Sequence, residues 1–149
     1  MQVLERLHPG YGIAAVRIMA GIVLVLAGYQ KLMGPGVAGI TGFFTSIGIP
    51  APGIMAVLVI AFEIIGGLLL LTGTFTRIVG AIMIVQFLVA GFAASWPSQA
   101  GWNAARLDFL LASIGLTVLL AGAGMLSVDR WLAGRRGGTG QRRVASATR

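Results

Sequence analysis

A single carboxylate, Glu63, stands in an otherwise apolar stretch, AFEIIGGLLLLTG at residues 61–73. A carboxylate can accept hydrogen bonds from a ligand, bind a cation, or take up and release a proton. An ionised carboxylate in the middle of a bilayer costs on the order of 3 kcal/mol, so it should face other helices and be paired or protonated. Glu63 is therefore the first candidate for chemistry in this chain.

Two further polar residues fall near Glu63 when depth is counted along the predicted helices. Glu63 lies about eight residues from the inner end of its helix, hence roughly 12 Å deep, and Gln86 lies at nearly the same depth. Arg17 lies about four residues from the inner end of the first helix, roughly 6 Å deep, and has a long side chain. We therefore predict a cluster of Glu63, Gln86 and Arg17.

This cluster has three interpretations that the residues leave open. Glu63 is a structural clasp, hydrogen-bonded to Gln86 or Arg17, that holds the bundle together. Alternatively, it contacts a ligand such as a quinone oxygen or a transported ion, or it carries a proton. The third interpretation is contact with another subunit.

Three other charged residues are secondary candidates. Lys31 closes the first predicted helix and Asp108 opens the last one, so the two could pair near the outer interface, with Arg106 as a competitor. Charge near an interface is tolerated because long side chains reach the headgroups. Arg77 follows a short turn, where we interpret it as a topology signal and a helix-terminus residue.

Several kinds of catalytic chemistry are excluded by what the sequence lacks. The chain has no cysteine and one histidine, His8. It therefore has no thiol relay, and within this chain alone it cannot hold haem between two histidines or a His-rich metal site. We find no nucleotide-binding motif either. We predict no metal and no covalently bound cofactor, and the sequence argues against catalysis by this chain alone.

The composition indicates a membrane protein. Hydrophobic residues make up 57% of the 149 residues and charged residues 10%, with a mean hydropathy of +0.93. Four continuous apolar runs are long enough to cross a hydrocarbon core of about 30 Å, whereas a β-barrel needs short alternating segments. The predicted fold is an all-α, integral membrane four-helix bundle over residues 13–126. Its helices are predicted at 13–32, 54–71, 78–94 and 107–126.

Basic residues predict the orientation of the bundle. One face carries Arg6, Arg17, Arg77 and the tail, and the other carries Lys31 and Arg106. By the positive-inside rule, both termini are predicted to be cytoplasmic. The first 12 residues are predicted to form a short cytoplasmic segment. Residues 127–149 are predicted to form a basic, disordered cytoplasmic tail, which is more typical of contact with lipid headgroups than of nucleic-acid binding.

The link between the second and third predicted helices is very short, running from Thr72 to Arg77. Such a link predicts an antiparallel hairpin in which the two helices pack together. Glycines recur in all four helices, and small residues allow membrane helices to approach closely.

The chain resembles the DoxX family of small four-helix bacterial membrane proteins over Val16 to Arg130. The resemblance rests on four segments taken in order and spacing. These are RIMAGIVLVLAGYQKLMG (17–34), GFFTSIGIPAP (42–52), FEIIGGLLLLTGTFTR (62–77) and LDFLLASIGLTVLLAGAGMLSVDR (107–130). Family members often carry a glutamate before the last helix, where this chain has Asp108.

The resemblance implies a four-helix bundle in the bacterial cytoplasmic (inner) membrane. Some relatives are described as subunits of quinone-linked oxidoreductases, including a thiosulfate:quinone type, and others belong to maturation systems or membrane redox complexes. Residue by residue, the resemblance gives weight to Lys31, Glu63, Arg77 and Asp108.

Our leading hypothesis is a DoxX-like membrane subunit that anchors a redox partner or lines a quinone pocket for it. The expected partners are the bilayer and a protein carrying the redox centre, without nucleic acid, and self-association stays open. The first alternative is a purely structural subunit of a larger membrane assembly. A small proton-coupled transporter ranks last, because the transporters of this size carry their acid in the first helix beside an aromatic-rich cavity.

Overall fold

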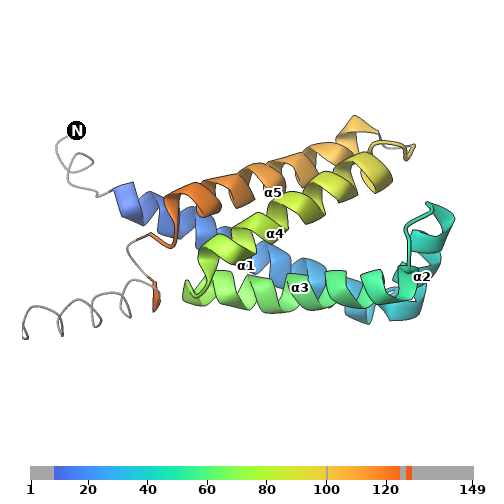
Figure 1. Ribbon diagram of the computed structural model, residues 1–149, viewed down its shortest axis with the longest axis horizontal. Helices are drawn as coiled ribbons and strands as arrows, with labels where there is room; N and C mark the ends of the chain where they lie inside the picture. The colour runs from blue at the N-terminus through green and yellow to red at the C-terminus, as the bar shows by residue number, and fades with distance from the viewer. Residues whose placement is uncertain (1–8, 100, 125–126, 129–149) are drawn as a thin grey trace, which may run out of the picture.

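The computed structural model describes residues 9–99, 101–124 and 127–128, and the regular structure in this part of the chain is helical throughout. The elements are α1 (Pro9–Met33), α2 (Gly36–Ser46), α3 (Pro52–Thr72), α4 (Thr76–Val89), the π-helix η2 (Ala90–Ser95) and α5 (Trp102–Ala121) (Figure 1). Helices α1, α3, α4 continued by η2, and α5 are each long and apolar enough to cross a membrane. This confirms the predicted all-α, four-helix membrane fold.

The helix bounds differ from the predicted ones mainly at the ends. Helix α1 begins at Pro9 rather than at residue 13, and α5 occupies Trp102–Ala121 rather than 107–126. The last helix ends early because Gly122 and Gly124 both have positive φ angles, of 73° and 72°, which glycine adopts without strain. The predicted tail, residues 127–149, lies outside the described residues except for its first two.

Two helix pairs form the body of the bundle. Helix α1 packs along α3, and α4 packs along α5, and these are the most extensive contacts between helices. Glycines face each other where the helices cross. A Cβ added to Gly67 would lie 2.8 Å from the carbonyl oxygen of Gly21, and one added to Gly80 would lie 2.7 Å from that of Gly115. The glycines therefore set how closely each pair approaches, as expected in membranes.

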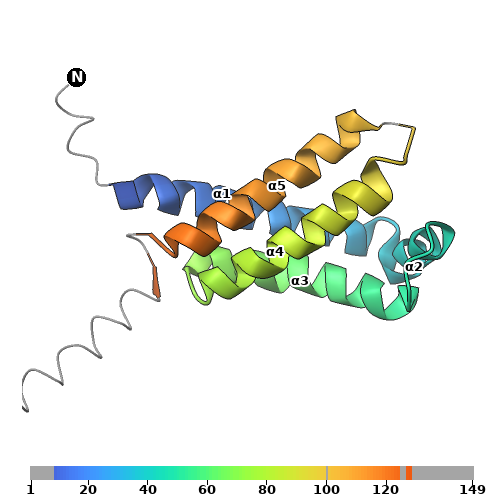
Figure 2. The same ribbon diagram turned by 45° about the horizontal axis from the view of Figure 1, so that its top comes forward.

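Helices α3 and α4 are antiparallel, but they do not pack as the hairpin that the short link predicted. They touch only over a small area and diverge from the turn between them (Figures 1 and 2). In that turn Gly73 and Phe75 both have left-handed φ angles, of 72° and 51°. The closest helix packing follows the glycine contacts, which join α3 to α1 and α4 to α5 instead.

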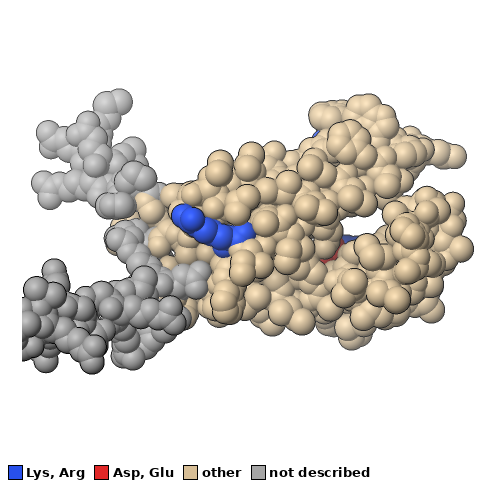
Figure 3. Space-filling view, viewed as in Figure 1, with Lys and Arg blue, Asp and Glu red and all other residues tan. Residues whose placement is uncertain are grey.

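The divergence gives the molecule a closed end and an open end. The closed end holds the start of α1, the α3–α4 turn and the end of α5, so both described ends of the helical body lie on the same side (Figure 1). The open end holds α2 and the loop between η2 and α5. Between the two pairs the surface is hollowed at the open end, and acidic and basic atoms are visible inside the hollow (Figure 3).

A hydrophobic core joins the four long helices. Its buried members come from α1, α3, α4 and α5 and are Ala20, Leu24, Leu70, Val79, Met83, Phe87, Ala112 and Val118. Large apolar side chains cover much of the outer surface, as expected for helices that face lipid.

Candidate functional site

Glu63 lies on the buried face of α3. Ile60, Glu63, Gly67 and Leu70 recur at helical spacing and are all buried. The Glu63 side chain is only 2% exposed. The sequence therefore directs this carboxylate into the bundle and away from lipid, as predicted.

Lys31 is the cation that pairs with Glu63. Its Nζ donates hydrogen bonds to both carboxylate oxygens, each at 2.8 Å, and its side chain is 34% exposed. Gly28, one turn earlier in α1, makes the approach possible, because a Cβ there would lie 3.0 Å from the Glu63 Cβ and 2.7 Å from Ile64 Cγ1. The ion pair thus joins α1 to α3 at a point of very close helix contact.

Gln86 completes the contact from α4. Its Nε2 donates a hydrogen bond to Glu63 Oε1 at 3.3 Å, as the equal depth of the two residues in the sequence predicted. Because α4 belongs to the other helix pair, this bond spans the two pairs. We call Lys31, Glu63 and Gln86 the acid cluster.

Arg17 is not part of the acid cluster, contrary to the prediction. It is buried, with 1% exposure, and its guanidinium lies against Gly73, where an added Cβ would overlap it. Gly73 follows Glu63 by ten residues, about 15 Å along a helix. The guanidinium thus occupies the C-terminal end of α3, where the helix dipole and the terminal carbonyls favour a cation.

Asp108 does not pair with Lys31, which the sequence had suggested. Instead, Asp108 Oδ2 accepts a 2.5 Å hydrogen bond from the Ser95 hydroxyl. Lys31 and Asp108 sit on α1 and α5, which belong to different helix pairs, and Lys31 contacts Glu63 of α3, the helix that packs along α1. Among the described residues no hydrogen bond joins Asp108 to Glu63, and the two carboxylates interact through their charges alone.

Ser95 was missed by the sequence reasoning, because the π-helix that presents it was not predicted. In η2 the Trp96 N–H donates to the carbonyl oxygen of Gly91 at 2.8 Å, a bond that spans five residues. Phe109 of α5 packs directly on Gly91, where a Cβ would lie 2.8 Å from its ring. This widened turn brings Ser95 to face α5, and such turns are frequent at functional sites.

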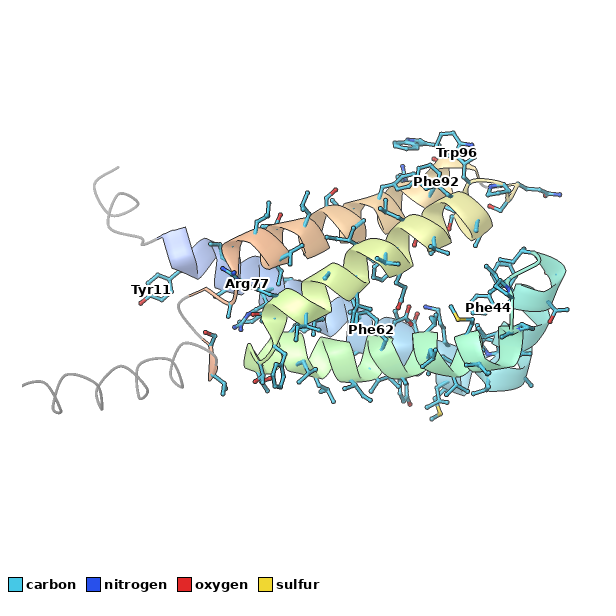
Figure 4. All side chains as sticks on the ribbon, in the orientation of Figure 1. Tyr11, Phe44, Phe62, Arg77, Phe92 and Trp96 are labelled. Atoms are coloured by element: carbon cyan, nitrogen blue, oxygen red, sulfur yellow. The ribbon has the colours of Figure 1, made fainter. Side chains whose placement is uncertain are left out.

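Arg77 lies at the closed end, far along the bundle from the acid cluster (Figure 4). A Cβ on Gly122 would lie 3.5 Å from its Nε, so the guanidinium is beside the C-terminal end of α5. A cation at this position complements the helix dipole, in keeping with a helix-terminus residue.

Aromatic side chains gather at the open end of the α4–α5 pair. Ring centroids lie 4.9 Å apart for Phe92 and Phe109, and 5.9 Å apart for Trp96 and Trp102. Phe92 and Trp96 project on the side of this pair that faces away from α3 (Figure 4). Exposed tryptophans at one end of a bundle are typical of a membrane–water interface.

The acid cluster can exchange hydrogen bonds with a polar headgroup. Lys31 ammonium and Gln86 amide both have N–H donors beyond those bonded to Glu63, and the Gln86 carbonyl and the carboxylate are acceptors. Glu63 and Asp108 are the only acids among the described residues, and no group of three metal-binding side chains occurs in that part of the chain. The donor and acceptor set suits carbonyl and hydroxyl oxygens.

Comparison with known proteins identifies the family. The family model DoxX matches residues 12–96, more than half of the chain. A Bacillus subtilis (strain 168) protein named "Putative oxidoreductase CatD" is 32% identical over 118 residues, which cover 79% of this chain and 84% of that protein. "Uncharacterized membrane protein Rv3486" of Mycobacterium tuberculosis (strain ATCC 25618 / H37Rv) is 34% identical over 143 residues, covering 87% of this chain and 86% of that protein. No solved structure matches the chain significantly. The chain is a multi-pass membrane protein of the DoxX family.

Proposed function

We propose that this chain is an integral subunit of a redox complex in the bacterial cytoplasmic (inner) membrane, and that its acid cluster binds a quinone headgroup. The observation that carries the proposal is a buried carboxylate, Glu63, held by Lys31 and Gln86 between two helix pairs that separate into a hollow. A buried charge inside a membrane is expensive, and it is by default a reason to propose a functional site.

The chemistry of the three side chains supports a quinone. Lys31 and Gln86 donate hydrogen bonds to carbonyl oxygens, and Glu63 accepts one from a hydroxyl. When bound, a quinone supplies two-electron, two-proton redox chemistry. The large apolar side chains exposed around the bundle leave the ligand's hydrophobic tail in contact with lipid.

A partner protein supplies the electrons in this proposal. The chain has no cysteine and no cluster of metal ligands in the described residues, so a redox centre has to come from elsewhere. The name "Putative oxidoreductase CatD", carried by the Bacillus subtilis relative, supports a redox role. Native mass spectrometry of the particle extracted from its own membrane tests this part. A bare chain without a redox partner would contradict it.

Direct binding tests the quinone site. The full chain is placed in nanodiscs and titrated with decylubiquinone. Lys31→Met and Gln86→Leu should each weaken the Kd by about tenfold, the effect of losing one good hydrogen bond. Glu63→Gln, which keeps the shape of the side chain, should weaken it similarly.

Matched controls are available for this titration. Gln30→Leu removes an exposed glutamine beside Lys31, and Arg77→Met removes an exposed cation at the closed end. Both should bind decylubiquinone as the wild type does. A Kd that is equal in all five variants would refute a quinone site at the acid cluster.

One observation favours a second function, that of a structural clasp. Glu63 already has hydrogen bonds from two helices of its own chain, so it can stabilise the bundle without a ligand. If this is its whole role, Glu63→Ala should lower thermal stability or complex assembly, while decylubiquinone binding is absent in every variant, wild type included.

A further inference from the structure

We propose that Asp108 and Ser95 form a proton relay that connects Glu63 to water at the open end of the bundle. This inference rests on the proposed function, because quinone chemistry at the acid cluster consumes or releases two protons that have to reach water. The partner protein supplies or accepts the two electrons, and none passes through Glu63, Asp108 or Ser95.

Glu63 needs such a connection because it is almost completely enclosed. Its side chain is 2% exposed, and it lies about eleven residues from the start of α3, hence roughly 16 Å from the open end. A proton bound to this carboxylate therefore has no direct contact with bulk water. Lys31 is partly exposed, but its ammonium has no lone pair to accept a proton. Another polar group, one that can accept a proton, has to lie between Glu63 and water.

Asp108 stands in the intermediate position. It is partly exposed and lies about six residues from the start of α5, roughly 9 Å along the helix. Its charge acts on Glu63. Among the described residues, the polar side chains that interact with Glu63 are Lys31 from α1, Gln86 from α4 and Asp108 from α5. Helix α2 contains no charged residue.

Ser95 is hydrogen-bonded to Asp108 and is the second member of the relay. Its hydroxyl donates to Asp108 Oδ2, and a hydroxyl can also accept a hydrogen bond from water. The π-helix exposes this group toward α5 at the open end, and Gly91 permits that turn by admitting the Phe109 ring.

The proton balance is simple. On the way in, an O–H bond of water or hydronium breaks as one forms at Asp108. Water entering the hollow carries the proton on: the O–H bond at Asp108 breaks as one forms on a water molecule, and an O–H bond of that water breaks as one forms at Glu63. The proton is then available to the ligand. The reverse order releases a proton, and Asp108 returns to its ionised form each time.

The test measures the rate at which Glu63 takes up a proton, in the absence of quinone. The full chain in nanodiscs is subjected to a rapid drop in pH, and stopped-flow infrared spectroscopy records the carboxylic C=O stretch that Glu63→Gln removes. Asp108→Asn should slow the appearance of this band by on the order of 100-fold, the effect of removing a positioned proton-transfer group. Ser95→Ala should slow it less, and Asp108→Glu should retain most of the rate.

Two matched controls separate proton transfer from general damage. Arg106→Gln removes an exposed charge on the same helix, and Ser113→Ala removes a hydroxyl that bonds only within α5. Both should show the wild-type rate. If Asp108→Asn does not fold, Ser95→Ala provides the same comparison against Ser113→Ala.

The inference fails independently of the proposed function. A wild-type rate in Asp108→Asn or, where that variant does not fold, in Ser95→Ala overturns it, as does the absence at every pH of a carboxylic band that Glu63→Gln removes. In either case decylubiquinone binding still reports on the quinone site. Asp108→Asn should leave the decylubiquinone Kd unchanged, and a loss as large as that in Glu63→Gln would instead place Asp108 in the binding site.

Discussion

At the scale of single residues, the Lys31–Glu63 ion pair is the most consequential contact. Taking two charges out of water is costly, and their attraction compensates only with good geometry. Here both carboxylate oxygens are bonded at 2.8 Å, while the Lys31 side chain is 34% exposed. Lys31 therefore keeps part of its hydration, and Glu63 depends on it.

This dependence predicts an asymmetric mutational effect. Lys31→Met should lower the free energy of unfolding by about 3 kcal/mol, because it leaves a buried carboxylate without its cation. Adding Glu63→Gln should restore part of that loss, because the double variant has no buried charge. Thermal unfolding in mild detergent, with Gln30→Leu as the control, measures both. Equal stability of the single and double variants would contradict the argument.

The depth of a residue along its helix could be predicted from the sequence. The neighbouring helix that its side chain contacts could not. The equal depth of Glu63 and Gln86 correctly predicted their contact. The predicted partners of Arg17 and Lys31 were wrong, because counting residues does not say which part of a neighbouring helix a long side chain will reach. That choice depends on the glycine contacts, such as Gly28 against Glu63 and Ile64, which a single sequence does not reveal.

At the scale of elements, the four spans follow from apolar length, whereas α2 and η2 do not. Helix α2 has only 11 residues and no buried side chain, so neither length nor an apolar stripe distinguishes it from a loop. The π-helix η2 is apolar like the helix before it, and Phe109 of a distant helix packs against Gly91 in its wider turn. These two unpredicted elements border the open end.

The glycine contacts between α1 and α3 give a prediction at this scale. Gly67→Ala would place a Cβ 2.9 Å from the Val25 backbone nitrogen and 2.8 Å from the Gly21 carbonyl oxygen. Backbone atoms cannot move aside easily, so we expect a loss of about 1–3 kcal/mol in unfolding free energy. Gly12→Ala, also in helix and with no atom within 4 Å of the added Cβ, should be neutral or slightly stabilising. Equal stability of the two variants in a thermal melt would show that this crossing tolerates a wider spacing.

At the scale of the whole molecule, the bundle consists of two tightly packed pairs that meet loosely. Contacts between the pairs are few compared with those inside them, and the pairs converge at the closed end and separate toward the open end (Figure 2). At the level of Glu63, a single 3.3 Å hydrogen bond from Gln86 links one pair to the other. The hollow is thus the part of the molecule that small relative motions of the pairs would change most.

Distances between pairs of spin labels test this arrangement. Because the chain has no native cysteine, labels attach only at cysteines that are introduced for the purpose. Labels at Ile54 and Asn103, which are exposed at the open end on different pairs, should give a broad distance distribution by pulsed electron paramagnetic resonance. Labels at Thr72 and Leu120, exposed at the closed end, should give a narrow one. Decylubiquinone should narrow only the first distribution, because a headgroup bonded to Lys31 from α1 and Gln86 from α4 connects the pairs. Gln86→Leu should abolish that narrowing, and equally narrow distributions at both ends would mean that the two pairs move as one rigid body.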